Sequence, residues 1–179
     1  TFLLVYKVAW LIFLPFIILY FVKRSIKEPN YRRNLKERFG FGDNFTSNAI
    51  WIHAVSLGEF RASVPLIKEL IGQSEKIIIT TITPAGREEA QRILESDLEA
   101  GNVYIVYLPL EYDFAFNKFV KRLKPRFAII LEYELWPVMI ASCGRNKIPL
   151  VLAQGQYIQS SFLFDKQWPS FRGALFKGV

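Results

Sequence analysis

The sequence predicts an α/β domain in which a parallel sheet has helices on both faces. Five short apolar runs, rich in β-branched residues, alternate with segments of helical periodicity. Several of these runs carry no charge, which is typical of strands buried on both faces of a parallel sheet. Because strands that alternate with helices form right-handed βαβ units, all five strands should point the same way. With 179 residues, 51% of them apolar, the chain can form one such domain and one further segment.

The further segment comes first and predicts a hydrophobic N-terminal helix. Residues 2–22 are almost wholly apolar, interrupted by Lys7 and Pro15, and are about long enough to cross a bilayer. No small-residue cleavage site follows, so residues 1–24 are interpreted as a membrane anchor and not as a signal peptide. A helix lying in the membrane interface is the alternative, which the lysine and the proline favour.

Basic residues are concentrated directly after this apolar stretch. Between Lys23 and Arg38 there are seven Lys or Arg residues and two Glu residues, which supply +5 of the net charge of +7. Residues 25–48 are therefore interpreted as a basic juxtamembrane segment. Its position favours an anionic membrane surface over nucleic acid as its partner. The alternative is a topology signal alone, which keeps the remaining chain in the cytoplasm.

Cysteine and histidine are too scarce for several kinds of site. Cys143 is the single cysteine of the sequence, so no internal disulfide can form. His53 is the single histidine, and one residue of each type does not make a structural zinc site, so we expect no metal and no bound cofactor. The turn after His53 lacks the Gly-x-Ser-x-Gly elbow of a hydrolase, and this histidine is interpreted as a packed, hydrogen-bonded residue.

The folded domain is expected to begin at Ala49, after a loop. Strands are predicted at residues 49–55, 76–82, 103–108, 126–131 and 149–153. Helices are predicted at residues 62–71, 84–94, 113–123 and 137–145. Pro65 should begin or kink the first helix. Thr83 suits the N-cap of the second helix and Pro84 its first position, and Asp113 can cap the third.

Two glutamates follow strands of the predicted sheet. Glu59 lies in the turn where Ser56 and Gly58 interrupt the first strand, and Glu132 follows the fourth strand. In a parallel sheet both carboxylates should lie at the carboxyl edge, where open α/β proteins bind ligands. Each glutamate also has a structural interpretation, because a helix start favours a carboxylate and Glu132 could pair with an arginine. The turn before Glu59 could bind phosphate, but one glycine falls short of a nucleotide-binding motif.

Four stretches together resemble the amino-terminal half of 3-deoxy-D-manno-octulosonic acid (Kdo) transferases. They are His53-Ala-Val-Ser-Leu-Gly-Glu59, Thr80-Thr-Ile-Thr-Pro84-Ala-Gly86, Val106-Tyr-Leu-Pro109 and Leu131-Glu-Tyr-Glu-Leu-Trp-Pro137. Their order and spacing match, and the likeness extends to the apolar start and to residues 31–40. The resemblance implies a Rossmann-like acceptor domain over residues 49–160, as the N-terminal half of a GT-B glycosyltransferase. Residues 161–179 would be a connector towards a donor domain.

The resemblance also implies an activity and a site. These enzymes transfer Kdo from CMP-Kdo to lipid A precursor (lipid IVA) in lipopolysaccharide synthesis, on the cytoplasmic face of the bacterial inner membrane. It assigns Glu59 as the general base that deprotonates the acceptor hydroxyl and Glu132 as a transition-state stabiliser. The further residues expected to contact the acceptor are Ser56, Gly58, Thr83, Arg87 and Trp136. Since the family's CMP-binding residues lie in the second domain, the isolated chain should be inactive.

The sequence departs from the family pattern after the fifth strand. Gln154-Gly-Gln-Tyr-Ile158 stands where the family usually has Asn-Ala-Arg-Leu-Ser or a close relative, so an arginine is missing. Tyr133 and Val138 replace the commoner Thr and Asn. The acceptor or the number of sugars added would differ if these positions touch it. Two other classes stay open: another membrane-bound GT-B enzyme with a glycolipid acceptor, and a non-catalytic membrane-anchored domain that binds a partner.

Overall fold

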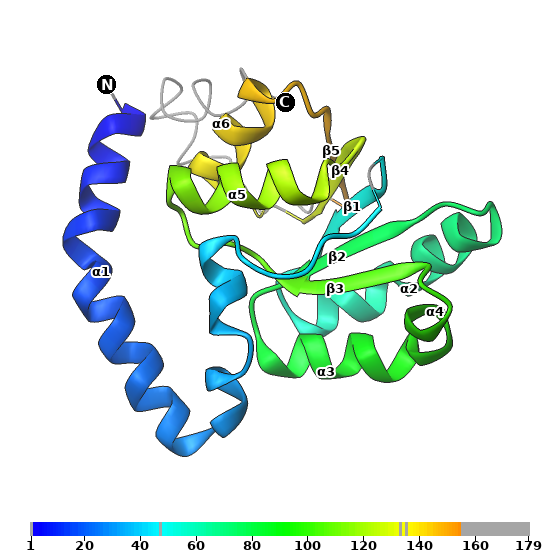
Figure 1. Ribbon diagram of the computed structural model, residues 1–179, viewed down its shortest axis with the longest axis horizontal. Coiled ribbons are helices and arrows are strands. Elements are labelled where there is room, and N and C mark those ends of the chain that lie inside the picture. Colours follow the sequence, from blue (N-terminus) through cyan, green and yellow to red (C-terminus); the bar gives the residue numbers. More distant parts are fainter. Residues whose placement is uncertain (1, 47, 133, 135, 155–179) are drawn as a thin grey trace.

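A five-stranded parallel sheet forms the centre of the domain, in the order β3-β2-β1-β4-β5 (Figure 1). The computed structural model describes residues 2–46, 48–132, 134 and 136–154. The strands are β1 (Ile50–His53), β2 (Ile77–Thr81), β3 (Val103–Tyr107), β4 (Phe127–Leu131) and β5 (Leu150–Ala153). Every neighbouring pair is parallel. The predicted α/β class and the direction of the strands are confirmed.

Helices cover both faces of this sheet (Figure 1). They are α2 (Leu57–Gly72), α3 (Pro84–Ile93), α4 (Glu95–Glu99), α5 (Asp113–Leu123) and α6 (Pro137–Arg145). Successive side chains of β1 point to opposite faces, so Trp51 packs with the core on the α5 and α6 side, whereas Ile50 and Ile52 pack on the α2 and α3 side. Both faces are therefore buried, as the uncharged strands predict.

Two predicted helix starts are wrong, and one short helix was not predicted. Helix α2 begins at Leu57 and not at residue 62, because Ser56 caps it, and Pro65 consequently lies inside the helix. No element was predicted at helix α4, because its five residues are too few for a periodic pattern. Asp113 is the first residue of α5 and not its cap, a position that Tyr112 takes.

The apolar N-terminal helix is confirmed as α1 (Phe2–Lys27), which extends beyond residue 24 and contains Pro15. Over Leu3–Lys27 it is long and apolar enough to cross a membrane. It lies beside the domain and contacts it near α5 (Figure 1). Lys7 Nζ is 2.6 Å from Asp113 Oδ2, and the Tyr112 hydroxyl donates to the carbonyl oxygen of Trp10 at 3.0 Å.

Two 3-10 turns, η1 (Pro29–Arg32) and η2 (Leu35–Phe39), connect α1 to the domain. The sequence suggests only a basic segment here, but Glu37 and Arg38 are 5% and 2% exposed. Glu37 forms a two-bond ion pair with Arg87 and accepts the backbone N–H of Tyr107 at 2.8 Å. Arg38 stacks on the Tyr107 ring, 4.1 Å from its centroid, and donates to the Ile82 carbonyl at 2.7 Å. The segment is thus built into the domain at the end of β3.

Candidate active site

Glu59 lies in the first turn of α2, directly after β1. Its Oε2 accepts the backbone N–H of Val55 at 2.8 Å, and its Oε1 accepts the Ser56 hydroxyl at 2.9 Å. Ser56 Oγ in turn accepts the Glu59 N–H at 3.3 Å, so the two residues form a variant of the capping box. Glu59 is 8% exposed and, among the described residues, no lysine or arginine pairs with it. The carboxylate is therefore fixed by neutral donors.

Glu132 follows β4, which pairs with β1 in a register that places His53 beside Ile130. The carboxyl ends of the two strands, and the glutamates after them, therefore lie at the same edge of the sheet. Glu132 is exposed and has a φ of +54°, a left-handed conformation that costs a non-glycine residue about 1 kcal/mol. Its backbone N–H donates to Ala153 at 3.0 Å, which ties it to the end of β5. Backbone strain of this kind is frequent at functional sites.

A third carboxylate, Glu134, joins these two. Burial raises its pKa, and the negative charges of Glu59 and Glu132 raise it further, whereas a hydrogen bond from Trp136 opposes the rise. Trp136 Nε1 donates to Glu134 Oε2 at 3.0 Å. Glu134 thus lies close enough to Glu59 and to Glu132 to feel the charge of each. The sequence analysis assigned Glu134 no role, although its position two residues after Glu132 was a usable signal.

The starts of α2 and α3 lie against each other, which brings three predicted residues together. Thr83 caps α3, and its Oγ1 accepts the Gly86 N–H at 3.1 Å, as predicted for this Thr-Pro pair. A Cβ on Gly86 would lie 3.5 Å from the backbone N of Leu57, so the starts of the two helices lie within van der Waals distance of each other. Ser56 bonds to Glu59, Gly58 precedes Glu59 in α2, and Thr83 caps the neighbouring helix start. Both helix N-termini carry partial positive charge, which favours a carboxylate or an anionic ligand here.

Arg87 is placed differently. Its guanidinium pairs with Glu37, donates to the Ile105 carbonyl at 3.3 Å and lies 4.8 Å from the centroid of the Tyr107 ring. These contacts direct it towards β3 and η2. The sequence does not predict this pairing, because Glu37 lies 50 residues from Arg87 and no periodic pattern relates the two.

His53 and Cys143 are both enclosed. His53 is fully buried with Nδ1 2.9 Å from Thr80 Oγ1, which confirms the predicted packed role. Burial lowers the pKa of His53 to about 4, so the ring is neutral near pH 7. Burial also raises the pKa of the Cys143 thiol to about 12. Within the described ranges, no group of three His, Cys, Asp or Glu residues is arranged to hold a metal ion.

Comparison with known proteins identifies the family of this chain. The family described as 3-Deoxy-D-manno-octulosonic-acid transferase (kdotransferase) matches residues 33–179. A 3-deoxy-D-manno-octulosonic acid transferase of Haemophilus influenzae is 34% identical over 156 residues, which is 84% of this chain and 35% of that protein. A probable mitochondrial one of Arabidopsis thaliana is 31% identical over 160 residues, 87% of this chain and 34% of that protein. The chain spans about a third of the length of these curated relatives. It belongs to the 3-deoxy-D-manno-octulosonic acid (Kdo) transferase family.

Proposed function

We propose that this chain is the acceptor-side domain of a GT-B glycosyltransferase that transfers Kdo from CMP-Kdo to the lipid A precursor, lipid IVA. Family membership supports the reaction class. The observation that carries the assignment to this domain is the Glu59 carboxylate, fixed at the carboxyl edge of the sheet beside Glu132 and Glu134. Residues 161–179, proposed as the connector to a donor domain, lie outside the described residues.

In the proposed reaction, Glu59 removes the proton from an acceptor sugar hydroxyl while its oxygen attacks the anomeric carbon of Kdo. The new bond joins these two atoms, the bond from the anomeric carbon to the CMP phosphate oxygen breaks, and CMP departs with that electron pair. Glu59 already accepts two hydrogen bonds, but a carboxylate has about four acceptor positions, so it can still accept one from the acceptor. A positioned base of this kind contributes a factor of about 10² to 10⁴.

Glu132 has a different proposed role. The anomeric carbon develops oxocarbenium character as CMP leaves, and a nearby carboxylate stabilises this positive charge, as in glycoside hydrolysis. Glu132 is exposed, so it can approach a bound substrate without displacing protein groups. Glu134, which Trp136 orients, adds negative charge to the same region.

Acceptor contacts are proposed at the junction of α2 and α3. Gly58 is exposed, and a Cβ there would meet only Ser56 Oγ, at 3.8 Å, so a sugar can approach the start of α2 closely. Thr83 and Trp136 would flank it. Arg87, which lines a polar cavity of about 200 Å³ together with Arg33, remains a proposed contact for a phosphate of the acceptor.

Attachment to the cytoplasmic face of the inner membrane is proposed through α1. Its large apolar side chains are widely exposed, for example Leu4, Ile12 and Phe16 at 66%, 63% and 63%. Burying such side chains in a bilayer is favourable. The exposed basic residues between Lys23 and Arg38 would face anionic headgroups, at about 1 kcal/mol for each one near the surface; they are Lys23, Lys27, Arg32, Arg33 and Lys36.

The test uses the full-length protein with lipid IVA. We expect transfer from CMP-Kdo and none from nucleotide-diphosphate sugars. Glu59→Gln should lower turnover by about 10² or more. It should leave the melting temperature and membrane attachment unchanged, because Gln also serves at this position of a capping box. Glu69→Gln, at an exposed position of the same helix, is the matched control and should leave turnover unchanged. Full turnover in Glu59→Gln would remove the proposed base.

A further inference from the structure

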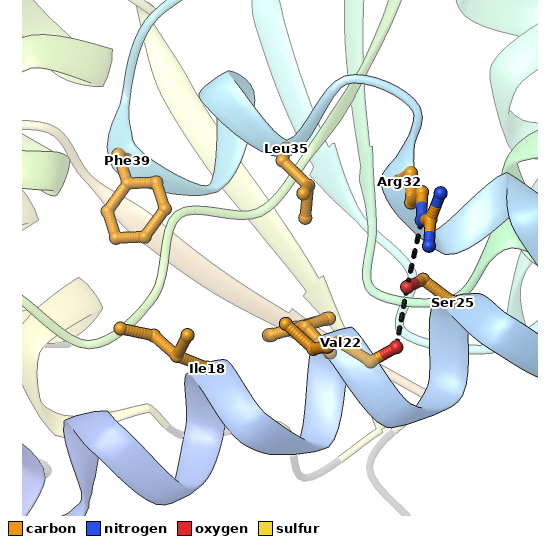
Figure 2. Close-up of a pocket in the computed structure, with 7 residues that line it drawn as sticks. Ile18, Val22, Ser25, Arg32, Leu35 and Phe39 are labelled. Atoms are coloured by element: carbon orange, nitrogen blue, oxygen red, sulfur yellow. Dashed lines mark hydrogen bonds between the residues drawn. The ribbon is translucent and has the colours of Figure 1, made fainter.

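A cavity of about 350 Å³ lies between the second half of α1 and the two 3-10 turns (Figure 2). Its apolar walls are formed by Ile18, Phe21, Val22, Leu35 and Phe39. Figure 2 shows Ile18 and Val22 on α1 facing Leu35 and Phe39 across the space. An apolar cavity of about 150 Å³ already holds a benzene-sized ligand, so this one has room for a longer hydrocarbon segment.

One end of the cavity is polar and built by a chain of hydrogen bonds. Arg32 Nε donates to Ser25 Oγ at 3.1 Å, and Ser25 Oγ donates to the Val22 carbonyl at 2.6 Å (Figure 2). Ser25 is 5% exposed, so this contact is sheltered from water. The bond from Nε to Ser25 holds the Arg32 guanidinium at the cavity. The other two nitrogens, Nη1 and Nη2, can then donate two parallel hydrogen bonds to a phosphate.

The surroundings favour a lipid over a soluble apolar molecule. Helix α1 is long and apolar enough to cross a membrane, and cavity residues Ile18 and Val22 on it are 49% and 51% exposed. The same helix surface would therefore contact both the bilayer and the cavity. A hydrocarbon chain that enters from the bilayer stays in apolar surroundings throughout. Once bound, it also covers the apolar walls of the cavity.

The charge around the cavity selects an anionic headgroup. Arg32 lies within the basic stretch that supplies +5 of the net charge of +7. Basic residues beside a membrane helix attract anionic lipids, and a guanidinium binds phosphate more strongly when other cations lie nearby. A zwitterionic headgroup would place its own cation among these residues.

We propose that this cavity binds one acyl chain of an anionic bilayer phospholipid whose phosphate contacts Arg32. The site contains neither Glu59 nor Glu132, and it stands whether or not the protein transfers Kdo. It rests only on the proposed attachment of α1 to the membrane. Its effect would be to join α1 to η1 and η2 through a bound lipid.

The test compares the same substitution on two faces of α1. The full-length protein is purified in detergent, delipidated and titrated with phosphatidylglycerol, and bound lipid is counted by native mass spectrometry. Val22→Trp fills the cavity and should weaken binding about tenfold or more. Val5→Trp, at a 62% exposed position that does not line the cavity, should bind like the wild type. Equal binding by all three proteins, or equal loss in both variants, would overturn the proposal.

Two further comparisons test whether the filled cavity and the Arg32 charge cause the effect. Leu35→Trp fills the cavity from the opposite wall and should reproduce Val22→Trp, which separates a filled cavity from a disturbed α1. Arg32→Gln should remove the preference for phosphatidylglycerol over phosphatidylcholine, whereas Arg33→Gln, which does not line this cavity, should retain it. Displacement of bound phosphatidylglycerol by lipid IVA at equal concentration would assign the cavity to the glycolipid and overturn the assignment to a bilayer phospholipid.

Discussion

Glu59 and Glu132 follow neighbouring strands, β1 and β4, but the protein holds them in different ways. Glu59 is almost buried, and its carboxylate bonds to groups three and four residues away. Glu132 is exposed, and its position depends on a left-handed backbone and on a bond to the end of β5. The comparison teaches that one acid is oriented by its own turn, whereas the other is oriented by the assembly of the sheet.

The largest expected effect is the loss of Kdo transfer when either glutamate is replaced. Glu59→Ala should lower turnover by about 10² or more and also cost about 1 kcal/mol of stability, because both the base and the cap partner are lost. Glu132→Ala should lower turnover with the free energy of unfolding little changed. Parallel turnover assays and urea titrations of the full-length protein measure both quantities. A loss of stability in Glu132→Ala equal to that in Glu59→Ala would contradict the distinction.

The second prediction concerns Glu111, a buried residue that holds the segment following Glu132 in place. Glu111 accepts the backbone N–H groups of Val138 and Met139 at 2.6 and 3.1 Å, so it holds the start of α6 just after the Glu132 loop. Burial raises the pKa of Glu111 to about 7, although these two hydrogen bonds act in the opposite direction.

The sign of the pH effect follows from this raised pKa. Between about pH 4.5 and pH 7 the unfolded chain has released this proton while the folded protein retains it, so stability should fall by about 3 kcal/mol as pH rises through this window. Glu111→Gln should flatten that decline in urea titrations, and Glu99→Gln, at an exposed position, should not. An unchanged slope in Glu111→Gln would show that another group titrates.

The smallest effect is expected from the backbone of Glu132 itself. Glu132→Gly should stabilise the fold by up to about 1 kcal/mol, since glycine adopts a positive φ without strain. Turnover should nevertheless fall, because the carboxylate is gone. Ser74→Gly, at an exposed residue with a φ of +63°, should give a similar gain with unchanged turnover. A lower melting temperature in Glu132→Gly would mean that the left-handed backbone is not the source of strain.

Local chemistry explains which features the sequence could predict. The strands, the packed His53 and the Thr83-Pro84 start of α3 follow from periodicity and from residues a few positions apart. The convergence of Glu59 and Glu132 on one edge follows from strand direction alone.

Contacts between distant residues explain what the sequence analysis missed. The pairing of Arg87 with Glu37 and the burial of Arg38 join segments that no periodic pattern relates. The early start of α2 was missed for another reason, because the helix was predicted only from residue 62, where its apolar periodicity begins, although Glu59 had been considered at a helix start. The departure at Gln154 to Ile158 falls mostly outside the described residues and stays a prediction.

The contact of Glu37 with β3 has a practical consequence for shortened forms of the protein. β3 is an outer strand of the sheet, and outer strands offer unpaired amides to other molecules, which is a common start of aggregation. The Glu37 carboxylate accepts the hydrogen bond of the Tyr107 backbone amide, and the ion pair with Arg87 fixes the position of Glu37. A form of the protein without α1 should therefore begin at Pro29. Removing η2 as well would expose the edge of β3 and favour strand pairing between molecules.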